Sequence, residues 1–403
     1  MELRIIQARG SPIKMINPQP NIGIIGLGEV FLEYAYPALS NLERQGVISI
    51  QKVADIKDIS GTVANLKGRH LKYPKERNSI DDVIGRLDHT KNPKNPIAHY
   101  QTTGDNFAPA TAADFFQDLD IVYIATPNNV RVELIRQAAE YEKAIIIEKP
   151  AAHTTRTLNE IIDILNRHDA RAICAEHYAY KDPSLEFFRT FEEQTKNFGK
   201  ITFIEGALYE DDFLDAERYE WLLDPSISGG GIWLDTGVHM MHLLYATGAE
   251  VEDVVSASSF SYKFPTGNPK NKIIRSETAA DVLVSLNSNT GRVDRNALAH
   301  LKVAKCMPYS SKYFKVLFEK GAVFLDFMNS TISYSDLTGQ TPKLTAMPVQ
   351  KTNPYENMVR MFVDRIGNGG SDLPTRMEKA IESTGAIFRV YKSMKEGDSR
   401  MFY

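Results

Sequence analysis

The amino-acid sequence predicts an α/β protein of two domains: a doubly wound parallel sheet first, then an α+β domain with a largely antiparallel open sheet. At 403 residues the chain is too long for one ordinary hydrophobic core. Strands and helices alternate through about the first 175 residues, which is typical of a parallel sheet with helices on both faces. Beyond about residue 200, strand-like segments follow one another across Gly, Asn and Pro turns, which favours an antiparallel sheet.

The elements of the first domain alternate in order. The expected strands are 21–28 with its terminal glycines, 48–56, 120–126, 144–147 and 170–175, and the expected helices are 29–45, 130–141 and 154–167. Residues 60–118 fit this pattern badly, and the stretch Lys91–Pro96 is turn-forming. We therefore interpret 60–118 as an insertion around one or two weak helices.

The second domain is expected to place its helices on one face of its sheet. Its expected strands are 200–209, 254–264, 279–286, 292–303, 313–318 and 322–327, and its expected helices are 237–246, 356–366 and 376–394. The domain boundaries then fall at 1–20 for an N-terminal extension, 21–180 for the parallel-sheet domain and 181–403 for the α+β domain.

Composition and charge exclude several classes of partner. A formal net charge of -4 without a long run of lysine and arginine argues against nucleic acid. No stretch approaches the roughly 18 apolar residues of a membrane span, and the N-terminus lacks a signal-peptide pattern, so we expect no membrane partner and a cytoplasmic location. Cys174 and Cys306 sit among apolar neighbours and are interpreted as buried free thiols.

A glycine-rich turn predicts a nucleotide site at the start of the first domain. The segment 23–28, Gly-Ile-Ile-Gly-Leu-Gly, lies where a strand gives way to a helix, so backbone can approach a pyrophosphate at the helix N-terminus. In such a Rossmann dinucleotide-binding domain, the expected cofactor contacts here are Gly26, Leu27, Gly28, Glu29 and Val30. Phe31 replaces the usual third glycine, so close helix–strand packing must be achieved differently. The alternative is a plain strand-to-helix turn.

Other polar residues follow strand ends, where ligands lie in open α/β sheets. Asp55 ends the second strand 27 residues after Gly28, roughly where an acidic residue binds both hydroxyls of an adenosine ribose. A carboxylate there repels the 2′-phosphate of NADP and so favours NAD, although Lys57 would soften the repulsion and a solvated loop aspartate is the alternative. Cofactor contact is also expected of the residues at two later strand ends, Thr126, Pro127, Asn128, Glu148 and Lys149.

The segment from Gly229 to His242 carries acid–base candidates. Asp235 and His239 are four residues apart, which places both on one helical face, and His242 follows three later. An Asp-x3-His-x2-His set can bind a divalent metal, but no persuasive further ligand accompanies it and no metal is expected. A histidine that titrates near neutrality beside a carboxylate can instead take a hydroxyl proton as hydride leaves the same carbon. A structural role is the alternative for both histidines.

Taken together, these motifs resemble the Gfo/Idh/MocA family, the relatives of glucose-fructose oxidoreductase and inositol dehydrogenase. The ordered series is Gly-Ile-Ile-Gly-Leu-Gly at 23–28, Ala-Thr-Pro-Asn at 125–128, Glu-Lys-Pro at 148–150, Trp-Leu-Leu-Asp-Pro at 221–225 and Gly-Gly-Gly-x3-Asp-x-Gly-x-His at 229–239. The resemblance implies a Rossmann domain followed by a substrate-binding and oligomerisation domain, whose open sheet supports homodimers or homotetramers. It also implies oxidation of a secondary alcohol on a sugar or cyclitol.

The resemblance implies roles for individual residues. Lys149 would hydrogen-bond the reacting hydroxyl, His239 would be the principal general base, and Asp235 would orient the substrate or the base. The expected substrate contacts are His177, Lys181, Trp221, Asp235 and His239. His177 and Lys181 look like the His-Tyr-x-x-Lys segment of glucose-6-phosphate dehydrogenases, which contacts substrate; a well-bonded interdomain hinge is the alternative for this segment.

Two departures from the family pattern bear on substrate choice. Arg131 stands where the family usually has histidine, and His242 where it commonly has aspartate. Arg131, or the basic residues within 270–275, can recognise a phosphate or carboxylate of the substrate, with a solvated charge cluster as the alternative.

We therefore expect an NAD(P)-dependent oxidoreductase acting on CH–OH groups, with NAD favoured as cofactor and a carbohydrate-like small molecule bound between the domains. Two other functions stay open. One is a redox-assisted lyase or glycosidase that uses NAD transiently, and the other is a non-catalytic, NAD-sensing regulatory protein.

Overall fold

The computed structural model describes residues 19–28, 31–55, 98–101, 107–210, 224–261, 276–305, 307, 309–338, 343–368 and 376–400. The chain divides into two compact units. The first unit contains Met1–Glu148, Asn159–Ala175 and Tyr355–Arg376, and the second contains Lys149–Leu158, Glu176–Pro354 and Met377–Tyr403. The chain therefore crosses from one unit to the other repeatedly.

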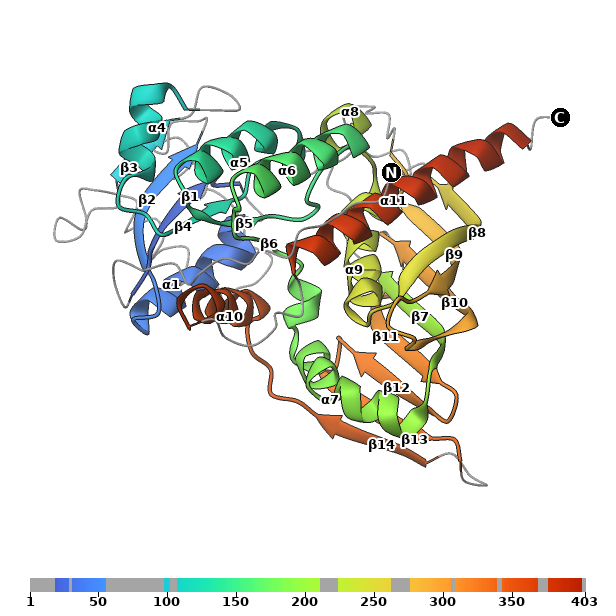
Figure 1. Ribbon diagram of the computed structural model, residues 1–403. Helices are drawn as coiled ribbons and strands as arrows, with labels where there is room; N and C mark the ends of the chain where they lie inside the picture. Colours follow the sequence, from blue (N-terminus) through green and yellow to red (C-terminus); the bar gives the residue numbers. More distant parts are fainter. Residues whose placement is uncertain are drawn as a thin grey trace. The chain divides into compact units, whose positions relative to one another are not determined.

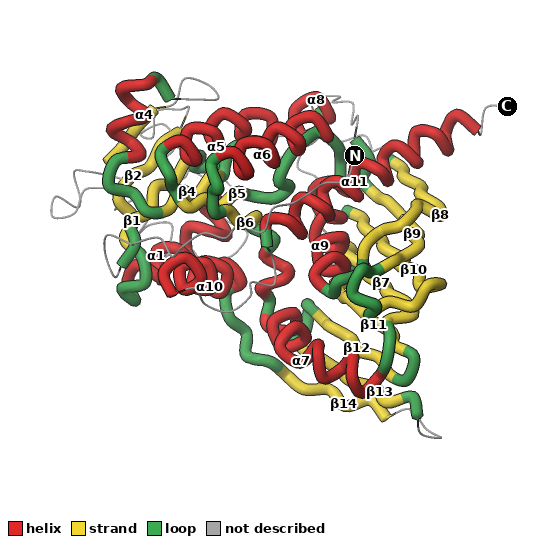
Figure 2. The backbone as a smooth tube through the Cα atoms, viewed as in Figure 1, coloured by secondary structure: helices red, strands yellow, loops and turns green. Residues whose placement is uncertain are grey.

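The first unit is built on a six-stranded sheet (Figure 2). In spatial order the strands are β3 (Ala98–Gln101), β2 (Ser49–Asp55), β1 (Asn21–Ile25), β4 (Ile121–Ile124), β5 (Ala144–Ile147) and β6 (Ala172–Cys174). Every neighbouring pair runs parallel, which confirms the predicted parallel sheet. The strand order reverses between β1 and β4, the switch point at which such sheets bind ligands. Strand β3 lies within 60–118 and was not predicted.

Helices cover both faces of this sheet (Figure 1). α1 (Tyr36–Arg44) and α10 (Pro354–Asn368) lie on one face, and α4 (Pro109–Phe116), α5 (Arg131–Glu140) and α6 (Thr155–Arg167) on the other. Because both faces are covered, β4 and β5 are buried along their whole length. Hydrogen bonds between residues that are 315 positions apart in the sequence join α1 to α10. Asn41 donates to Glu356, and Arg360 donates to Gln45. α10 thus groups with the first unit, although the sequence analysis assigned 181–403 to the second domain.

The second unit is built on an eight-stranded sheet (Figure 2). In spatial order the strands are β14 (Lys343–Pro348), β13 (Thr331–Asp336), β12 (Gly321–Asp326), β11 (Ser311–Phe318), β7 (Ile201–Tyr209), β10 (Val293–Ala304), β9 (Ala279–Asn287) and β8 (Glu250–Phe260). β7 and β10 run parallel, and the other described neighbours run antiparallel, which confirms the predicted sheet. β13 and β14 were not predicted, because each has only six residues; β13 contains four Thr, Ser or Asp residues, and β14 contains a Lys and a Thr.

Helices of the second unit lie on one face of its sheet (Figure 1). The helical segments are η4 (His177–Tyr180), α7 (Asp182–Phe198), α8 (Pro225–Ser228), η5 (Trp233–Gly237), α9 (Val238–Ala246) and α11 (Met377–Arg400), and α7 was not predicted. On β11, the residues Phe314, Val316 and Phe318 are buried, and the Phe318 ring meets Phe191 of α7. The alternate residues of β11 therefore point to the opposite face, which none of the described helices covers. No described helix is long and apolar enough to cross a membrane.

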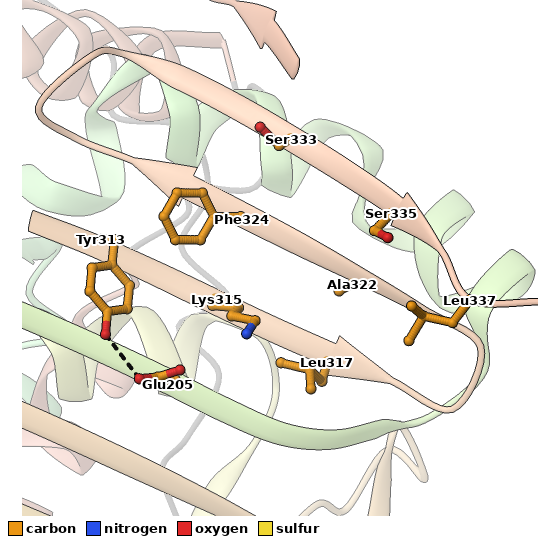
Figure 3. Close-up of a pocket in the computed structure, with 9 residues that line it drawn as sticks. All are labelled: Glu205, Tyr313, Lys315, Leu317, Ala322, Phe324, Ser333, Ser335 and Leu337. Carbon is orange, nitrogen blue, oxygen red and sulfur yellow. Dashed lines mark hydrogen bonds between the residues drawn. The ribbon is translucent and has the colours of Figure 1, made fainter. Parts of the chain in front are cut away.

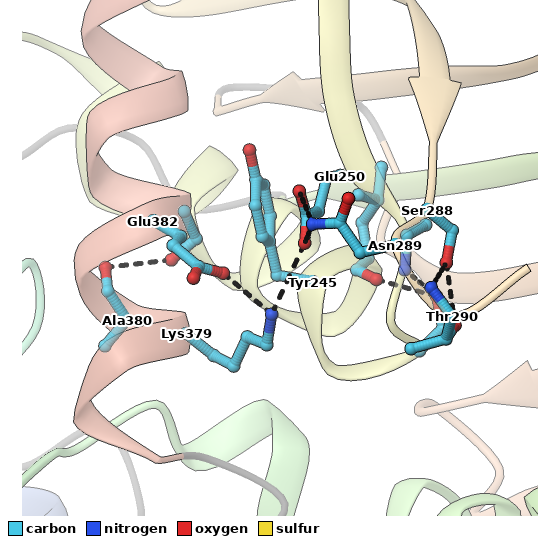
Figure 4. A network of polar contacts seen from close by, with 12 residues as sticks. Tyr245, Glu250, Ser288, Asn289, Thr290, Lys379, Ala380 and Glu382 are labelled. Carbon is cyan, nitrogen blue, oxygen red and sulfur yellow. Dashed lines mark hydrogen bonds and ion pairs between the residues drawn. The ribbon is translucent and has the colours of Figure 1, made fainter. Parts of the chain in front are cut away.

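Polar contacts tie α11 to the end of the sheet formed by β8 and β9 (Figure 4). The Nζ atom of Lys379 lies 2.8 Å from Oε2 of Glu382 and 3.9 Å from Oε1 of Glu250, and Asn289 donates to Glu250. Such partly exposed contacts contribute roughly 0–1 kcal/mol each. Burial of apolar residues of α11 such as Ile387 is the larger stabilising term.

Candidate active site

The glycine turn of the first unit follows β1 directly. Gly26 has a φ of +93°, and an added Cβ would lie 2.8 Å from the Ala125 backbone, so only glycine fits there. Its N–H donates to the carbonyl of Ala54 (2.8 Å), and the N–H of Leu27 donates to Oδ2 of Asp55 (2.7 Å). Asp55 therefore fixes the turn from the end of β2.

The surroundings of this turn fit a dinucleotide. A Cβ added at Gly28 would have no neighbour within 4 Å, so the backbone there is open to a ligand. At the end of β4, the Thr126 hydroxyl is buried without a hydrogen-bond partner among the described residues, and the side chain of Asn128 is buried beside it in the chain. The Thr126 hydroxyl thus lies at the edge of the sheet where ligands bind, and a ligand there could supply its hydrogen-bond partner. Pro127 is exposed.

Phe31 occupies the position of the usual third glycine and is only 2% exposed. Its ring packs edge-on against Tyr123 and Tyr36, with centroids 5.2 Å and 6.3 Å apart. The turn that begins with it, η1 (Phe31–Ala35), is π-helical, a wider turn than an α-helical one. With a glycine at this position the helix and the strand would pack closely together; here the Phe31 ring fills the space between them. Glu29 and Val30, which were predicted to contact the cofactor, lie outside the described residues.

Arg131 joins two strand ends of the first unit. Its Nε donates to the carbonyl of Thr126 (2.8 Å), and its Nη1 donates to the carbonyl of Glu148. Burial lowers the pKa of Arg131 to about 10, while the nearby Glu148 acts in the opposite direction. Oε1 of Glu148 in turn accepts a hydrogen bond from the Tyr123 hydroxyl (2.7 Å). Arg131 is therefore an internal brace, which disfavours the alternative that it recognises substrate; residues 270–275 lie outside the described residues.

In the second unit, Lys149 and Asp235 form a partly buried ion pair. Nζ of Lys149 lies 2.7 Å from Oδ1 of Asp235 and donates also to its backbone carbonyl (2.8 Å). Lys305 lies 3.3 Å from the other carboxylate oxygen. Burial alone would raise the pKa of Asp235, but Lys149 and Lys305 outweigh burial and hold the pKa below its usual range. Asp235 is thus ionised and fixes the Lys149 ammonium in place.

Two further residues extend this ion pair into a ladder of alternating charge. Glu210 lies 3.9 Å from Lys305 and 2.8 Å from Lys312. Burial opposes ionisation of Glu210, but the two lysines still lower its pKa. No motif in the sequence indicates Lys305, Glu210 or Lys312. Each of them lies at the end or the start of a different strand.

His239 is paired with Glu176. Its Nδ1 lies 2.9 Å from Oε2 of Glu176, and the two side chains are 4% and 1% exposed. Burial, followed by His177 and Lys149, lowers the pKa of His239 well below its usual value, which favours a neutral imidazole. An ionised Glu176 accepts but does not donate, so it places the ring proton on Nδ1 and leaves Nε2 as the basic nitrogen. Glu176 is a site residue that the sequence analysis did not single out, although it directly precedes His177.

The predicted substrate residues His177 and Lys181 lie beside His239. The His177 ring meets the His239 ring edge-on with centroids 4.5 Å apart, and the Tyr178 ring centre lies 4.8 Å from that of His239. Nζ of Lys181 stands 4.3 Å from the centre of the Tyr178 ring. Trp221 lies outside the described residues, so its predicted substrate contact stays a prediction.

A polar clamp holds the turn that carries Asp235. Oε1 of Glu277 accepts from the N–H groups of Gly231 and Trp233, both at 3.1 Å. The Tyr391 hydroxyl accepts from the N–H groups of Gly231 (3.1 Å) and Leu234 (3.0 Å), and donates to Glu277 (2.5 Å). These acceptors satisfy N–H groups at the start of a helix that has no side-chain cap of its own. The clamp thereby positions η5, in which Asp235 lies.

Gly230 explains part of the glycine run. A Cβ added at this position would lie 2.3 Å from the Tyr391 hydroxyl oxygen, closer than atoms can approach. The glycines at 229–231 therefore let the backbone approach the clamp closely, at the point where the chain enters the helix.

Replacing Tyr391 by phenylalanine is expected to lower the free energy of unfolding by about 1–3 kcal/mol, because the N–H of Leu234 loses its acceptor in a buried turn. Urea denaturation measures the change. As a matched control, the same replacement at the exposed Tyr309 should change stability by less than about 0.5 kcal/mol. Equal effects at the two positions would contradict the clamp.

The metal interpretation gains no support from His242. Its Nδ1 lies 3.4 Å from Oγ of Ser383, and burial, followed by Lys379, lowers its pKa to about 3. Asp235, His239 and His242 therefore have three different partners. Within the described residues, no group of three or more His, Cys, Asp or Glu side chains is arranged to hold a metal ion.

The geometry joins a hydrogen-bond donor to a base. Lys149 is fixed by its ion pair with Asp235, and it lies near enough to His239 to lower the pKa of the imidazole. An ammonium that donates to a hydroxyl oxygen favours loss of the hydroxyl proton, and a neutral imidazole can accept that proton. The second unit thus holds the groups needed for acid–base chemistry at an alcohol.

Two family models match this chain. Residues 20–176 match the model described as an oxidoreductase family with an NAD-binding Rossmann fold, GFO_IDH_MocA, and residues 194–324 match the GFO/IDH/MocA C-terminal domain. Together the two models cover more than half of the chain.

Curated relatives and a solved structure agree with these matches. The chain is 28% identical over 141 residues to D-xylose 1-dehydrogenase [NADP(+)] of Haloarcula marismortui, which is 35% of this chain and 38% of that protein. It is 28% identical over 127 residues to levoglucosan dehydrogenase of Pseudarthrobacter phenanthrenivorans, 31% of this chain and 32% of that protein. The matched parts thus span about a third of the length of either relative.

A solved structure of levoglucosan dehydrogenase in complex with NADH and levoglucosan superposes with a TM-score of 0.71 at 16% identity, covering 94% of this chain and 98% of that one. At this identity the likeness concerns the fold alone.

Proposed function

The chain belongs to the Gfo/Idh/MocA oxidoreductase family, and on that premise we propose that it is an NAD-dependent dehydrogenase of a sugar, sugar derivative or cyclitol. It would oxidise a secondary alcohol to a ketone and catalyse the reverse reduction. The observation that carries the proposal is the arrangement of Lys149 on Asp235 and of His239 on Glu176. The relatives that oxidise xylose and levoglucosan support a carbohydrate as substrate.

The first unit would hold the cofactor. The glycine turn at 26–28 would meet the pyrophosphate, and the Thr126 hydroxyl and Asn128 would meet another part of the cofactor. Asp55 beside that turn favours NAD over NADP, since its carboxylate would repel a 2′-phosphate. When bound, the nicotinamide accepts the hydride and its two electrons.

The second unit would move the proton. Nε2 of His239 takes the hydroxyl proton, and the Lys149 ammonium donates to the same oxygen and stabilises the negative charge that develops on it. Asp235 holds Lys149 in place. Glu176 fixes the tautomer of His239 and offsets the positive charge that the imidazole gains.

The experiment is to mix the full chain with NAD and a panel of sugars and cyclitols, and to measure NADH and ketone together. We expect the two products in equal amounts. Product with no net NADH would instead indicate a redox-assisted lyase or glycosidase. Tight NAD binding without turnover of any panel member would indicate a regulatory NAD sensor.

We also propose that the chain forms a homodimer or homotetramer through the face of the eight-stranded sheet that no described helix covers. Figure 3 shows Tyr313, Lys315 and Leu317 of β11 and Phe324 of β12 gathered there. These apolar and polar side chains are only partly buried, and Tyr313 donates to Glu205 (2.9 Å). A face of mixed apolar and polar groups is typical of interfaces between subunits.

Replacing both Leu317 and Phe324 by arginine is expected to reduce the mass of the particle in solution to that of one chain, because unpaired charge is costly in an apolar interface. Light scattering measures this mass. Arginine in place of the exposed Glu140 on α5 should leave it unchanged. An oligomer that survives the double replacement would place the interface elsewhere.

A further inference from the structure

Lys181 is a partly buried cation whose neighbours are aromatic. Its Nζ stands 4.3 Å from the centre of the Tyr178 ring and 5.8 Å from that of Phe327. No carboxylate of the described residues forms an ion pair with it. The next residue, Asp182, has its two oxygens bonded to the N–H and hydroxyl of Thr352.

The charges of the described residues at the site do not cancel. Its lysines are Lys149, Lys181, Lys305 and Lys312, and its carboxylates are Glu176, Glu210 and Asp235. The three carboxylates contact His239 and the other three lysines, so Lys181 contributes the excess positive charge. One unbalanced charge fits a singly charged anion better than a doubly charged one.

The electrostatic surroundings agree with this count. Burial, followed by Lys312 and Lys351, lowers the pKa of Lys181 to about 8, although Glu210 acts in the opposite direction. Burial, followed by Lys181, Lys149 and Lys312, also lowers the pKa of His177. A bound anion would relieve this repulsion and keep Lys181 charged.

Lys181 is also near the base. The centre of the Tyr178 ring lies 4.3 Å from Nζ of Lys181 and 4.8 Å from the centre of the His239 ring, so Nζ of Lys181 and the His239 ring are at most about 9 Å apart. One monosaccharide can therefore place a hydroxyl at His239 and a substituent at Lys181, with a hydrogen bond at each end.

We propose that Lys181 binds the carboxylate of a sugar acid, so that the substrate is a hexuronate-like acid rather than a neutral sugar. The inference rests on the proposed function, because it names the substrate class of the same site. A carboxylate that accepts a charge-assisted hydrogen bond from a partly buried ammonium gains specificity over a neutral group of the same shape.

The test is calorimetric titration of the full chain saturated with NADH, in which an alcohol binds but cannot be oxidised. The probes are matched pairs of hexuronate and hexose in the gluco, galacto and manno configurations, with the hexose 6-phosphates as a third arm. The variants are Lys181→Met, Lys181→Arg and, as a matched control, Lys320→Met at an exposed turn of the same unit.

At least one hexuronate is expected to bind the native protein about 10- to 100-fold more tightly than its hexose. Lys181→Met should abolish this difference with little effect on the hexose, Lys181→Arg should keep most of it, and Lys320→Met should keep all of it. The preference should also decline at pH values above about 8, where Lys181 loses its proton.

Equal binding of acid and hexose, or an equal loss of both in Lys181→Met, would overturn the proposal. Tighter binding of a 6-phosphate than of every hexuronate would overturn the choice of carboxylate. Binding is measured without turnover, so failure of the proposed function has a separate sign: a hexuronate that binds through Lys181 but never yields NADH with NAD.

Discussion

Replacing Lys149 by methionine is expected to lower kcat/KM at least about 10²-fold for every substrate that the protein oxidises. Methionine keeps the length and apolar stem of the side chain but cannot donate to the reacting oxygen or stabilise its developing charge. Because Lys305 stays beside Asp235, the carboxylate keeps one cation and the site should remain folded. Steady-state kinetics with NAD and the preferred substrate measures the loss.

The control for this variant lies at the other end of the same strand. Lys143 directly precedes β5 and donates to the carbonyl of Leu119 (2.9 Å), whereas Lys149 follows β5. Lys143→Met should keep kcat/KM within a few-fold of the native value, and both variants should bind NAD as the native protein does. Native turnover by Lys149→Met would exclude it from the chemistry.

The second large effect is expected at His239. His239→Asn should reduce kcat at least about 10²-fold, because asparagine can occupy the place of Nδ1 but has no basic nitrogen to take the proton. His242→Asn, on the same helix, should keep near-native kcat, since His242 contacts Ser383 rather than Glu176. A comparison of the two variants separates proton transfer from the packing of a buried histidine, and equal losses in both would count against a base at His239.

Glu176→Gln tests how His239 is positioned. A glutamine amide can donate to Nδ1 of His239. The ring proton would then lie on Nε2, and the base would be lost. Replacing an orienting carboxylate of this kind can lower kcat by about 10⁴-fold. We expect a large fall in kcat, little change in KM, and an altered pH profile of kcat. A purely structural role would leave that profile unchanged.

The sequence predicts best what is local. The glycine turn, Asp55 and the strand-end segments are recognisable because each depends on backbone conformation within a few residues, and the structure joins Asp55 to Leu27. Lys149 and Asp235 were predicted for one site, and the structure brings them to 2.7 Å. Their roles in catalysis stay predictions that the variants above test.

Contacts between distant segments escaped the sequence. Asp235 and His239 suggested a shared helical face, but each meets a residue far away in the chain, Lys305 and Glu176. A single glutamate or lysine at a strand end looks like a solvated residue until the sheet order is known. The register of β7, β10 and β11 brings Glu210, Lys305 and Lys312 together, and no spacing in the sequence records it.

Two helices differ from the prediction for a similar reason: α7 was not predicted, and α10 was assigned to the second domain. Helix α7 has several phenylalanines but also many charged residues, and its buried Phe191 meets Phe318 of the second sheet, far away in the chain. α10 has an ordinary amphipathic pattern, which does not say which sheet it will cover.

The placement of α10 has a consequence for how the protein is made. During synthesis, β1 to β6 leave the ribosome first, but the partners of Asn41 and Gln45 are Glu356 and Arg360, which emerge after the whole eight-stranded sheet has been translated. Domains usually fold as units during synthesis, N-terminal first. Here the nascent first unit must wait with one face of its sheet incompletely covered, and apolar residues of α10 such as Met358 and Phe362 complete it only near the end of translation.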